Sequence, residues 1–213
     1  MTIVLAMLRE GFAVIAADSA VSTYARDGRT GTMRKIASDA NVLVAHAGLA
    51  PRVGSRASPP LPMALMRLPQ GPRDLERVAA GLEGIYAGWA TDLARSAEER
   101  EPNSGSDENF SLVLATFERG RVRMGELRMG GSPMPFTERR VGELVAFCPS
   151  QELYGFFENR RVSLNAVAGA DELAEAMRAT ILAAVPVGGP SVGPPVDAAI
   201  LDGEDVRFLP AAM

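Results

Sequence analysis

Three chemically versatile residue types are almost missing from this chain of 213 residues: cysteine, histidine and lysine occur once each, as Cys148, His46 and Lys35. One cysteine cannot form a disulfide within the chain, and one cysteine with one histidine is too few for a Cys/His metal site. The chain also lacks a Walker loop, a GxGxxG segment and an HExxH segment. The sequence therefore gives no reason to expect an oxidising compartment, a cofactor or a metal.

Long apolar runs and clusters of positive charge are missing as well. No stretch approaches the roughly 20 apolar residues that a membrane-spanning helix needs. The apolar residues 1–8 follow no basic segment and are interrupted by Arg9 and Glu10, which argues against a signal peptide. A formal net charge of −4 without a polybasic segment gives no basis for binding nucleic acid or a membrane surface. We expect a cytoplasmic protein whose partner is a protein, a peptide or a small molecule.

The patterning of apolar residues predicts a single domain of mixed structure over residues 1–213. Helical spacing predicts helices at 74–93, 150–159 and 171–185. Apolar runs between turn residues predict strands at 2–8, 12–17, 41–47, 110–117, 121–129, 141–148, 196–201 and 206–209, with a bulge near Gly125. Residues 18–33, 51–72 and 98–108 are polar, glycine-rich or proline-rich and predict loops. Hairpins separated from helices along the chain indicate an α+β fold, with two antiparallel sheets between helical layers.

The three rare residues differ in what they indicate. His46 lies in an apolar strand-like run, which favours a histidine in the core or in a pocket wall over a catalytic one. Cys148 ends another apolar strand, which favours a buried structural thiol over a nucleophile. Lys35 is the one lysine among 22 basic residues. Lysine serves where a pKa must move toward neutrality, because guanidinium stays charged; codon bias that left one lysine explains the count equally well.

Four short segments carry a family resemblance. They are TIVLA at 2–6, VIAADS at 14–19, RKI at 34–36 and AGLA at 47–50. In this order and at nearly this spacing they resemble the opening of proteasome β-subunits and of the bacterial heat-shock-locus protease. Residues 192–209 are similar to the final strands of that family, and the match is poorest over 51–72, where proline replaces the family's first long helix. The resemblance implies an N-terminal-nucleophile (Ntn) hydrolase, an α+β fold with a four-layer αββα sandwich.

The resemblance also implies a catalytic set. Thr2, once Met1 is removed, would supply both the attacking hydroxyl and a free α-amine as base, whose reference pKa is about 7.7–8.0. Lys35 would lower that pKa by like-charge repulsion, and Asp18 would hold Lys35 by a charge-assisted hydrogen bond. The backbone N–H of Gly48 would face the developing oxyanion. Without the resemblance, Asp18 and Lys35 are explained as a solvated loop pair and Gly48 as a turn residue.

The sequence departs from the family at the supporting groups. The family's Ser-Gly pair after the strand at 141–148 is replaced by Pro149 and Ser150, and Ser150 substitutes only after a shift of one residue. In the later Asp-x-x-Ser-Gly segment Ser191 matches the serine, but the aspartate is missing. Such groups orient the amine and hydroxyl of the nucleophile, so their loss would lower turnover.

A second set of positions matches the family's substrate side-chain pocket: Ala20, Ser22, His46 and Ala50. With His46 at its base this pocket would be small and polar.

Three functions are compatible with these residues. The first is a threonine-type peptidase, assembled as a homo-oligomeric ring or stack and fed by an ATP-dependent unfoldase, as the family implies. The second is a catalytically silent ring or scaffold protein, because the supporting groups are altered. The third is an amidase or acylase of the same fold that acts on a small molecule. The sequence indicates neither the substrate nor the ring size.

Overall fold

The structure is a computed structural model of the whole chain. It describes residues 3–22, 30–32, 34–47, 52–53, 56–57, 60–99, 110–129, 134–188 and 192–212, without the side chains of 20–22, 30–32, 52–53, 56–57, 89–99 and 134–135. No helix among these residues has both the length and the apolar character needed to cross a membrane.

Two five-stranded antiparallel sheets form the centre of the fold. The first has the order β12-β1-β2-β13-β14, with β1 Val4–Arg9, β2 Phe12–Asp18, β12 Leu144–Phe147, β13 Val196–Asp202 and β14 Asp205–Ala212. The second has the order β11-β10-β9-β6-β5, with β5 Ile36–Asp39, β6 Val42–Ala47, β9 Phe110–Glu118, β10 Arg121–Met129 and β11 Met134–Arg139. Two short ladders join β3 Ala20–Ser22 to β4 Thr30–Thr32 and β7 Arg52–Val53 to β8 Arg56–Ala57.

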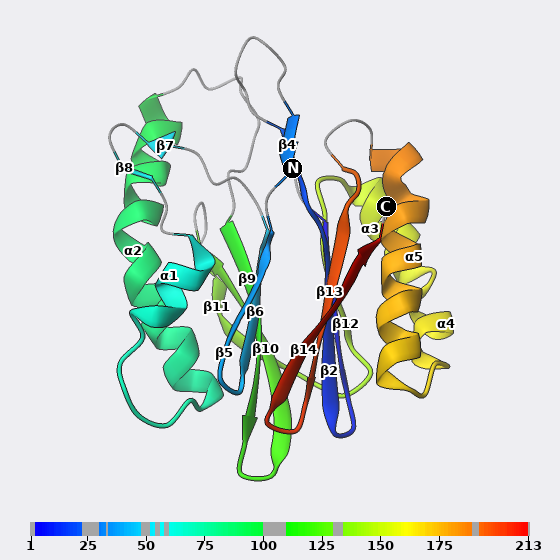
Figure 1. Cartoon of the computed structure of the whole chain (residues 1–213). Coiled ribbons are helices and arrows are strands. Elements are labelled where there is room, and N and C mark those ends of the chain that lie inside the picture. The colour runs from blue at the N-terminus through cyan, green and yellow to red at the C-terminus, as the bar shows by residue number, and fades with distance from the viewer. Residues whose placement is uncertain are drawn as a thin grey trace.

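Helices cover the outer face of each sheet (Figure 1). The helices α1 Leu61–Met66 and α2 Leu75–Glu99 pack on the second sheet, and α3 Gln151–Glu158, α4 Arg161–Asn165 and α5 Ala170–Gly188 pack on the first. A third apolar cluster fills the space between the sheets. The α+β prediction with two antiparallel sheets is therefore confirmed, in a sandwich-like arrangement.

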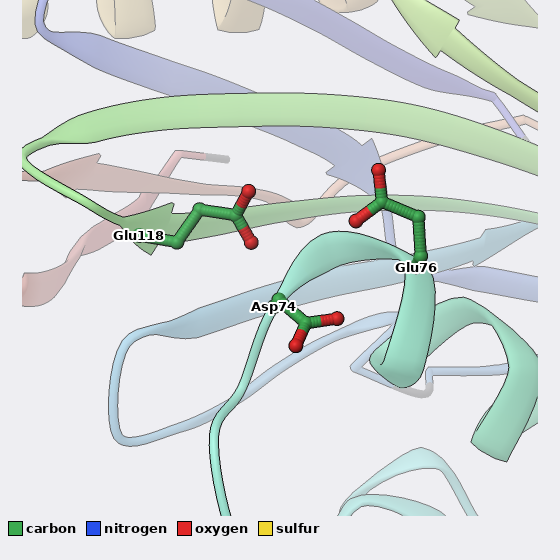
Figure 2. Close-up of side chains that lie close together, drawn as sticks. All are labelled: Asp74, Glu76 and Glu118. Carbon is green, nitrogen blue, oxygen red and sulfur yellow. The ribbon is translucent and has the colours of Figure 1, made fainter.

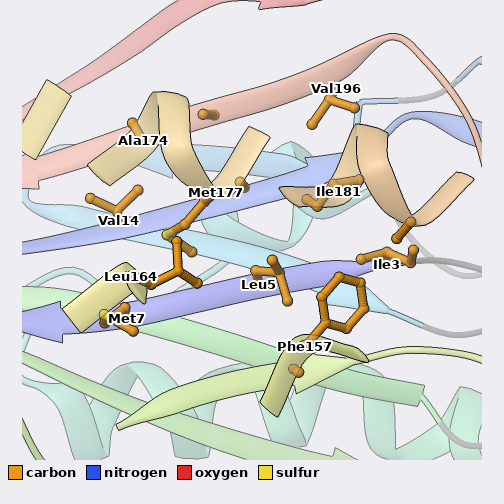
Figure 3. Close-up of a cluster of buried hydrophobic side chains, with 14 of the residues drawn as sticks. Ile3, Leu5, Met7, Val14, Phe157, Leu164, Ala174, Met177, Ile181 and Val196 are labelled. Carbon is orange, nitrogen blue, oxygen red and sulfur yellow. The ribbon is translucent and has the colours of Figure 1, made fainter. Parts of the chain in front are cut away.

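Strand β1 explains why the N-terminal residues form one continuous apolar run. Ile3, Leu5 and Met7 point toward α3, α4 and α5, where they meet Phe157 and Ile181 (Figure 3). The residues between them point the other way, into the cluster between the sheets. A strand buried on both faces loses the polar alternation of a half-exposed strand. Phe157 is fully buried, so its truncation to alanine would cost about 3–5 kcal/mol of folding free energy.

The hairpins predicted from turn residues are confirmed for β1–β2, β9–β10 and β13–β14. In the β9–β10 turn, Arg119 and Gly120 both have positive φ, of 51° and 77°. That geometry matches the right-handed twist of the flanking strands and favours glycine at the second position.

Other details differ from the sequence prediction. The loop at 18–33 contains the ladder β3–β4, and β11 and α4 were not predicted. Strand β11 is an edge strand that carries Pro135 and charged residues, which weakens a strand signal. The β9–β10 pairing runs in constant register through Gly125, where a bulge was predicted, and the irregularity lies in the β10–β11 pairing between Glu126 and Arg128, with the extra residue on β11. Gly125 serves a different purpose: a Cβ there would lie 2.4 Å from the ring of Phe136.

Candidate active site

Four strand ends meet at one end of the sandwich. Because β1 and β2 are antiparallel, the start of β1 lies beside the end of β2, with Val4 opposite Ala17. In the other sheet the start of β5 lies beside the end of β6, with Ile36 opposite Ala45. The turns of the hairpins β5–β6, β9–β10 and β13–β14 lie at the opposite end, the lower end in Figure 1. The end of β2 and the residue before β5 therefore belong to the end of the sandwich away from these turns.

A buried ion pair joins the two sheets at this end. Asp18 closes β2 and Lys35 immediately precedes β5, and the Lys35 Nζ lies 2.9 Å from the Asp18 Oδ1. Their side chains are 0% and 2% exposed. The same Asp18 oxygen accepts a hydrogen bond of 2.7 Å from the backbone N–H of Ile3. One carboxylate oxygen thus holds both the ammonium group and the beginning of the first strand.

Burial works against both charges of this pair. It raises the pKa of Asp18, although Lys35 and the backbone N–H groups of Ile3 and Gly193 act in the opposite direction. Burial likewise lowers the pKa of Lys35, against the attraction of Asp18. The Oδ2 atom of Asp18 is buried and has no hydrogen-bond partner among the described residues. A lysine in these surroundings is a more ready proton donor than a solvated lysine.

A second polar group beside this pair was missed in the sequence. The Ser19 hydroxyl donates a hydrogen bond of 2.8 Å to the Asp197 Oδ2, and the Arg34 Nε lies 4.0 Å from the same oxygen. Asp197 therefore contacts the residue after Asp18 and the residue before Lys35, which ties the two segments together. The signal in the sequence was a charged residue inside the apolar run 196–201, because a buried carboxylate needs a partner.

His46 lies on the helix-covered side of β6. Its ring stacks on Phe110 at a centroid distance of 5.9 Å, and its backbone N–H donates to the carbonyl of Lys35. Burial, with a further effect from the Lys35 charge, lowers the pKa of His46 to about 4. The imidazole is therefore neutral at pH 7, as for a histidine in the core or in a pocket wall.

Ser150 and Cys148 follow β12. The Ser150 hydroxyl accepts a hydrogen bond of 3.2 Å from the N–H of Leu153 and caps the N-terminus of α3. The Cys148 thiol contacts the carbonyl of Ser150, and burial raises its pKa. A thiol with a raised pKa is a poor nucleophile at neutral pH.

The other predicted site residues are only partly described. Thr2, Gly48, Ala50 and Ser191 lie outside the described residues. Ala20 and Ser22 lie in β3, but their side chains are not described. Of the predicted catalytic set, the structure brings together Asp18 and Lys35.

A cluster of carboxylates at the turn end of the sandwich is the one group in the described chain with the spacing of a metal site. Oxygen atoms of Asp74, Glu76 and Glu118 all lie within 4.8 Å of one another (Figure 2). Arg123 already pairs with Glu76 and Glu118, and the N–H of Leu75 donates to Glu118. The guanidinium group supplies the positive charge that these carboxylates need.

Comparison with known proteins adds the fold type. No protein-family model and no curated protein matches the chain. Among solved structures, Anbu from Hyphomicrobium sp. strain MC1 is similar with a TM-score of 0.64 and 17% identity, and a mutant form of it with a TM-score of 0.62 and 16% identity. Each match covers 98% of this chain and 86% of the other. At this identity the likeness shows the fold alone.

This finding corrects the family resemblance drawn from the sequence. The two solved structures named above are Anbu, a related but different family from the proteasome β-subunits and the heat-shock-locus protease. The assignment was wrong because it depended on motifs of three to six residues. Residues at strand ends such as Asp18 and Lys35 follow the shared fold and do not separate related families.

Proposed function

We propose that this chain is a threonine-type amide hydrolase whose nucleophile is Thr2, exposed by removal of Met1. The observation that carries the proposal is the double use of the Asp18 Oδ1, which binds the Lys35 Nζ at 2.9 Å and the Ile3 N–H at 2.7 Å. The two nitrogen atoms therefore lie within roughly 6 Å of each other on one acceptor. Thr2 precedes Ile3 in the sequence, so a short covalent path links its amine and hydroxyl to this point.

The chemistry needs a free amine beside a hydroxyl. The Thr2 hydroxyl attacks the carbonyl carbon of the substrate amide, and the α-amine takes the hydroxyl proton. As the C–N bond breaks, that proton passes to the leaving amine and an ester to Thr2 remains. Water, deprotonated by the same amine, then hydrolyses the ester and releases a carboxylic acid. The Lys35 ammonium favours the neutral amine by repulsion, and Asp18 fixes its position.

The oxyanion of the tetrahedral intermediate needs a donor. We propose the backbone N–H of Gly48 for this role, because Gly48 follows Ala47, the last residue of β6. One such donor stabilises a transition state by about 3 kcal/mol.

Replacement of Thr2 tests the proposal. Thr2→Ala should abolish turnover across a panel of fluorogenic peptides and short acyl amides, whereas Thr2→Ser should retain part of it. Ser163→Ala, an exposed hydroxyl on α4, is the matched control and should be neutral. Activity that survives Thr2→Ala would rule out Thr2 as the nucleophile. The preferred substrates in the panel would separate a peptidase from a small-molecule amidase.

One observation favours a catalytically silent scaffold as the second candidate. The Ser150 hydroxyl is used as the N-cap of α3, so it is not free to orient a nucleophile in this conformation. A scaffold would assemble normally and show no activity that depends on Thr2.

Assembly with copies of the same chain is part of the proposal, as is the single-domain, four-layer αββα organisation. Light scattering of the purified protein should give a mass well above 22.5 kDa. A protein that stays monomeric over a wide concentration range would contradict the proposed self-association.

A further inference from the structure

A group of charged residues lies between the sheets, where the neighbouring residues are apolar. On β10, Val122 and Met124 belong to the inter-sheet cluster, and strand alternation places Glu126 and Arg128 on the same face. Arg139 of β11 pairs with Met124 and approaches Glu126 from the edge of the sheet. The Arg128 guanidinium stacks over the ring of Phe147 from the other sheet, at 5.5 Å from its centroid. The group therefore bridges the two sheets.

The hydrogen-bonding capacity of this group is not filled. Glu126 is 2% exposed, and its Oε1 lies 2.5 Å from Arg139 but 3.6 Å from Arg128, which is beyond a hydrogen bond. The Glu126 Oε2 and the Nε atoms of Arg128 and Arg139 are buried without a partner among the described residues. Arg139 also lies 3.7 Å from Glu143. Within the part of the chain that the structure describes, Arg128 is thus the cation of the group with no carboxylate oxygen at hydrogen-bond distance.

Strand pairing places Arg128 at the same end of the sandwich as Asp18 and Lys35. In the second sheet Arg128 pairs with Ser111, and Ser111 pairs with Ala47 at the end of β6. In the first sheet Phe147 pairs with Val4, near the start of β1. Each pairing is a Cα separation of about 5 Å. The guanidinium therefore lies within roughly 15 Å of the start of β1, which is the length of four to five extended residues.

We propose that Arg128 is a specificity residue that binds a carboxylate of the substrate, a few residues from the scissile amide. This inference rests on the proposed hydrolase function. The Arg128 side chain is 42% exposed, and its guanidinium lies over the Phe147 ring, 5.5 Å from the ring centroid. A planar fork of N–H donors fits a carboxylate with two parallel hydrogen bonds. The carboxylate is either an acidic side chain or the C-terminus of a peptide.

A binding experiment separates these sources without requiring turnover. Fluorescence anisotropy on the full-length Thr2→Ala protein would use one labelled peptide in four forms: with Glu or with Gln at the test position, each with a free or an amidated C-terminus. The anionic form that Arg128 recognises should bind about tenfold more tightly than its neutral counterpart. A preference for Glu over Gln indicates a side-chain carboxylate, and a preference for the free terminus indicates a C-terminal one.

Substitutions of Arg128 test whether this residue causes the preference for anionic peptides. Arg128→Gln, in the same Thr2→Ala background, should remove the preference and leave the affinity for neutral peptides unchanged, while Arg128→Lys should retain part of it. Arg121→Gln, on the exposed start of β10, is the control and should keep the full preference. Equal affinity for anionic and neutral peptides in the unaltered Arg128 background overturns the inference, as does a preference that survives Arg128→Gln. These results leave the hydrolase proposal standing, because that proposal depends on Thr2 and is measured by turnover.

Discussion

Both ends of the sandwich carry charged groups, but the folded protein favours the charged forms of these groups at one end and disfavours them at the other. At the turn end, Arg123 forms ion pairs with Glu76, Glu118 and Glu138, two of which are about half exposed. Hydrogen bonds from Arg123 lower the pKa of Glu76 and Glu138, so the folded protein favours their charged forms. At the other end, burial raises the pKa of Asp18 and lowers that of Lys35, so folding disfavours their charges.

The two groups of charges therefore differ in what their burial costs the folded protein. An exposed pair contributes little but costs little, because solvent still reaches it. A buried pair has a desolvation penalty that often equals its attraction, and apolar residues of similar volume would fold as well. Stability alone is therefore a weak explanation of the Asp18–Lys35 pair, and the proposed hydrolase function would give the pair a role. Substitutions at the two ends should therefore differ in their effects on folding stability and on catalytic activity.

Breaking the buried pair should have the largest effect. Lys35→Met leaves the buried Asp18 carboxylate without its cation, which should cost about 3–5 kcal/mol of folding free energy. It should also lower kcat/KM by about two to four orders of magnitude, the usual range for loss of acid–base support. Urea unfolding and steady-state kinetics measure the two effects.

A double variant separates the two effects. Asp18→Asn combined with Lys35→Met keeps an acceptor for the Ile3 N–H and removes both charges, so most of the stability should return while activity stays lost. If the double variant regained activity with its stability, the pair would be structural.

His46 should make stability depend on pH. Its pKa falls from 6.5 to about 4 on folding, so between these values the unfolded chain binds a proton that the folded chain does not. Stability should therefore fall as the pH drops from about 6.5 to 4, by on the order of 3 kcal/mol from this residue. His46→Gln should remove this part of the pH dependence in urea titrations. An identical pH profile for both proteins would mean that the imidazole is solvated.

The Ser19–Asp197 contact should have an intermediate effect. Ser19→Ala leaves the buried Asp197 carboxylate without its hydroxyl donor, at a cost of about 1–3 kcal/mol. Because Asp197 holds the segments on both sides of the ion pair, kcat should fall more than KM changes. A KM effect at constant kcat would instead place Asp197 in substrate binding.

The exposed network should show the smallest effect. Glu138→Gln removes one of three carboxylates around Arg123 and should cost about 0.5 kcal/mol, less at high salt. Since the folded pKa of Glu138 is lowered, its contribution is present above its ordinary pKa near 4.5 and disappears as the pH falls through the folded value. Activity at neutral pH should not change. A loss of activity would show that the two ends of the sandwich are coupled.

The sequence was sufficient for features that depend on local pattern. Helix α2 is long and strongly periodic, strand β1 is a continuous apolar run, and the short motifs of the family resemblance singled out Asp18 and Lys35. Features that depend on packing could not be predicted from the sequence: β11 is a polar edge strand, and Ser19 and Asp197 are in contact although 178 positions separate them in the sequence. Arg128 was not identified either, because only the pairing of β10 with β9 and of β9 with β6 shows that it lies at the same end of the sandwich as the ion pair.

The role of Thr2 as nucleophile can be tested by mass spectrometry of the intact protein, treated with an electrophile that requires a hydroxyl and a free amine on the same residue. We expect loss of Met1 and one adduct, located on Thr2 by peptide mapping, that is strongly reduced in Lys35→Met. Protein from its own cells that retains Met1 throughout and takes up no adduct would refute this role.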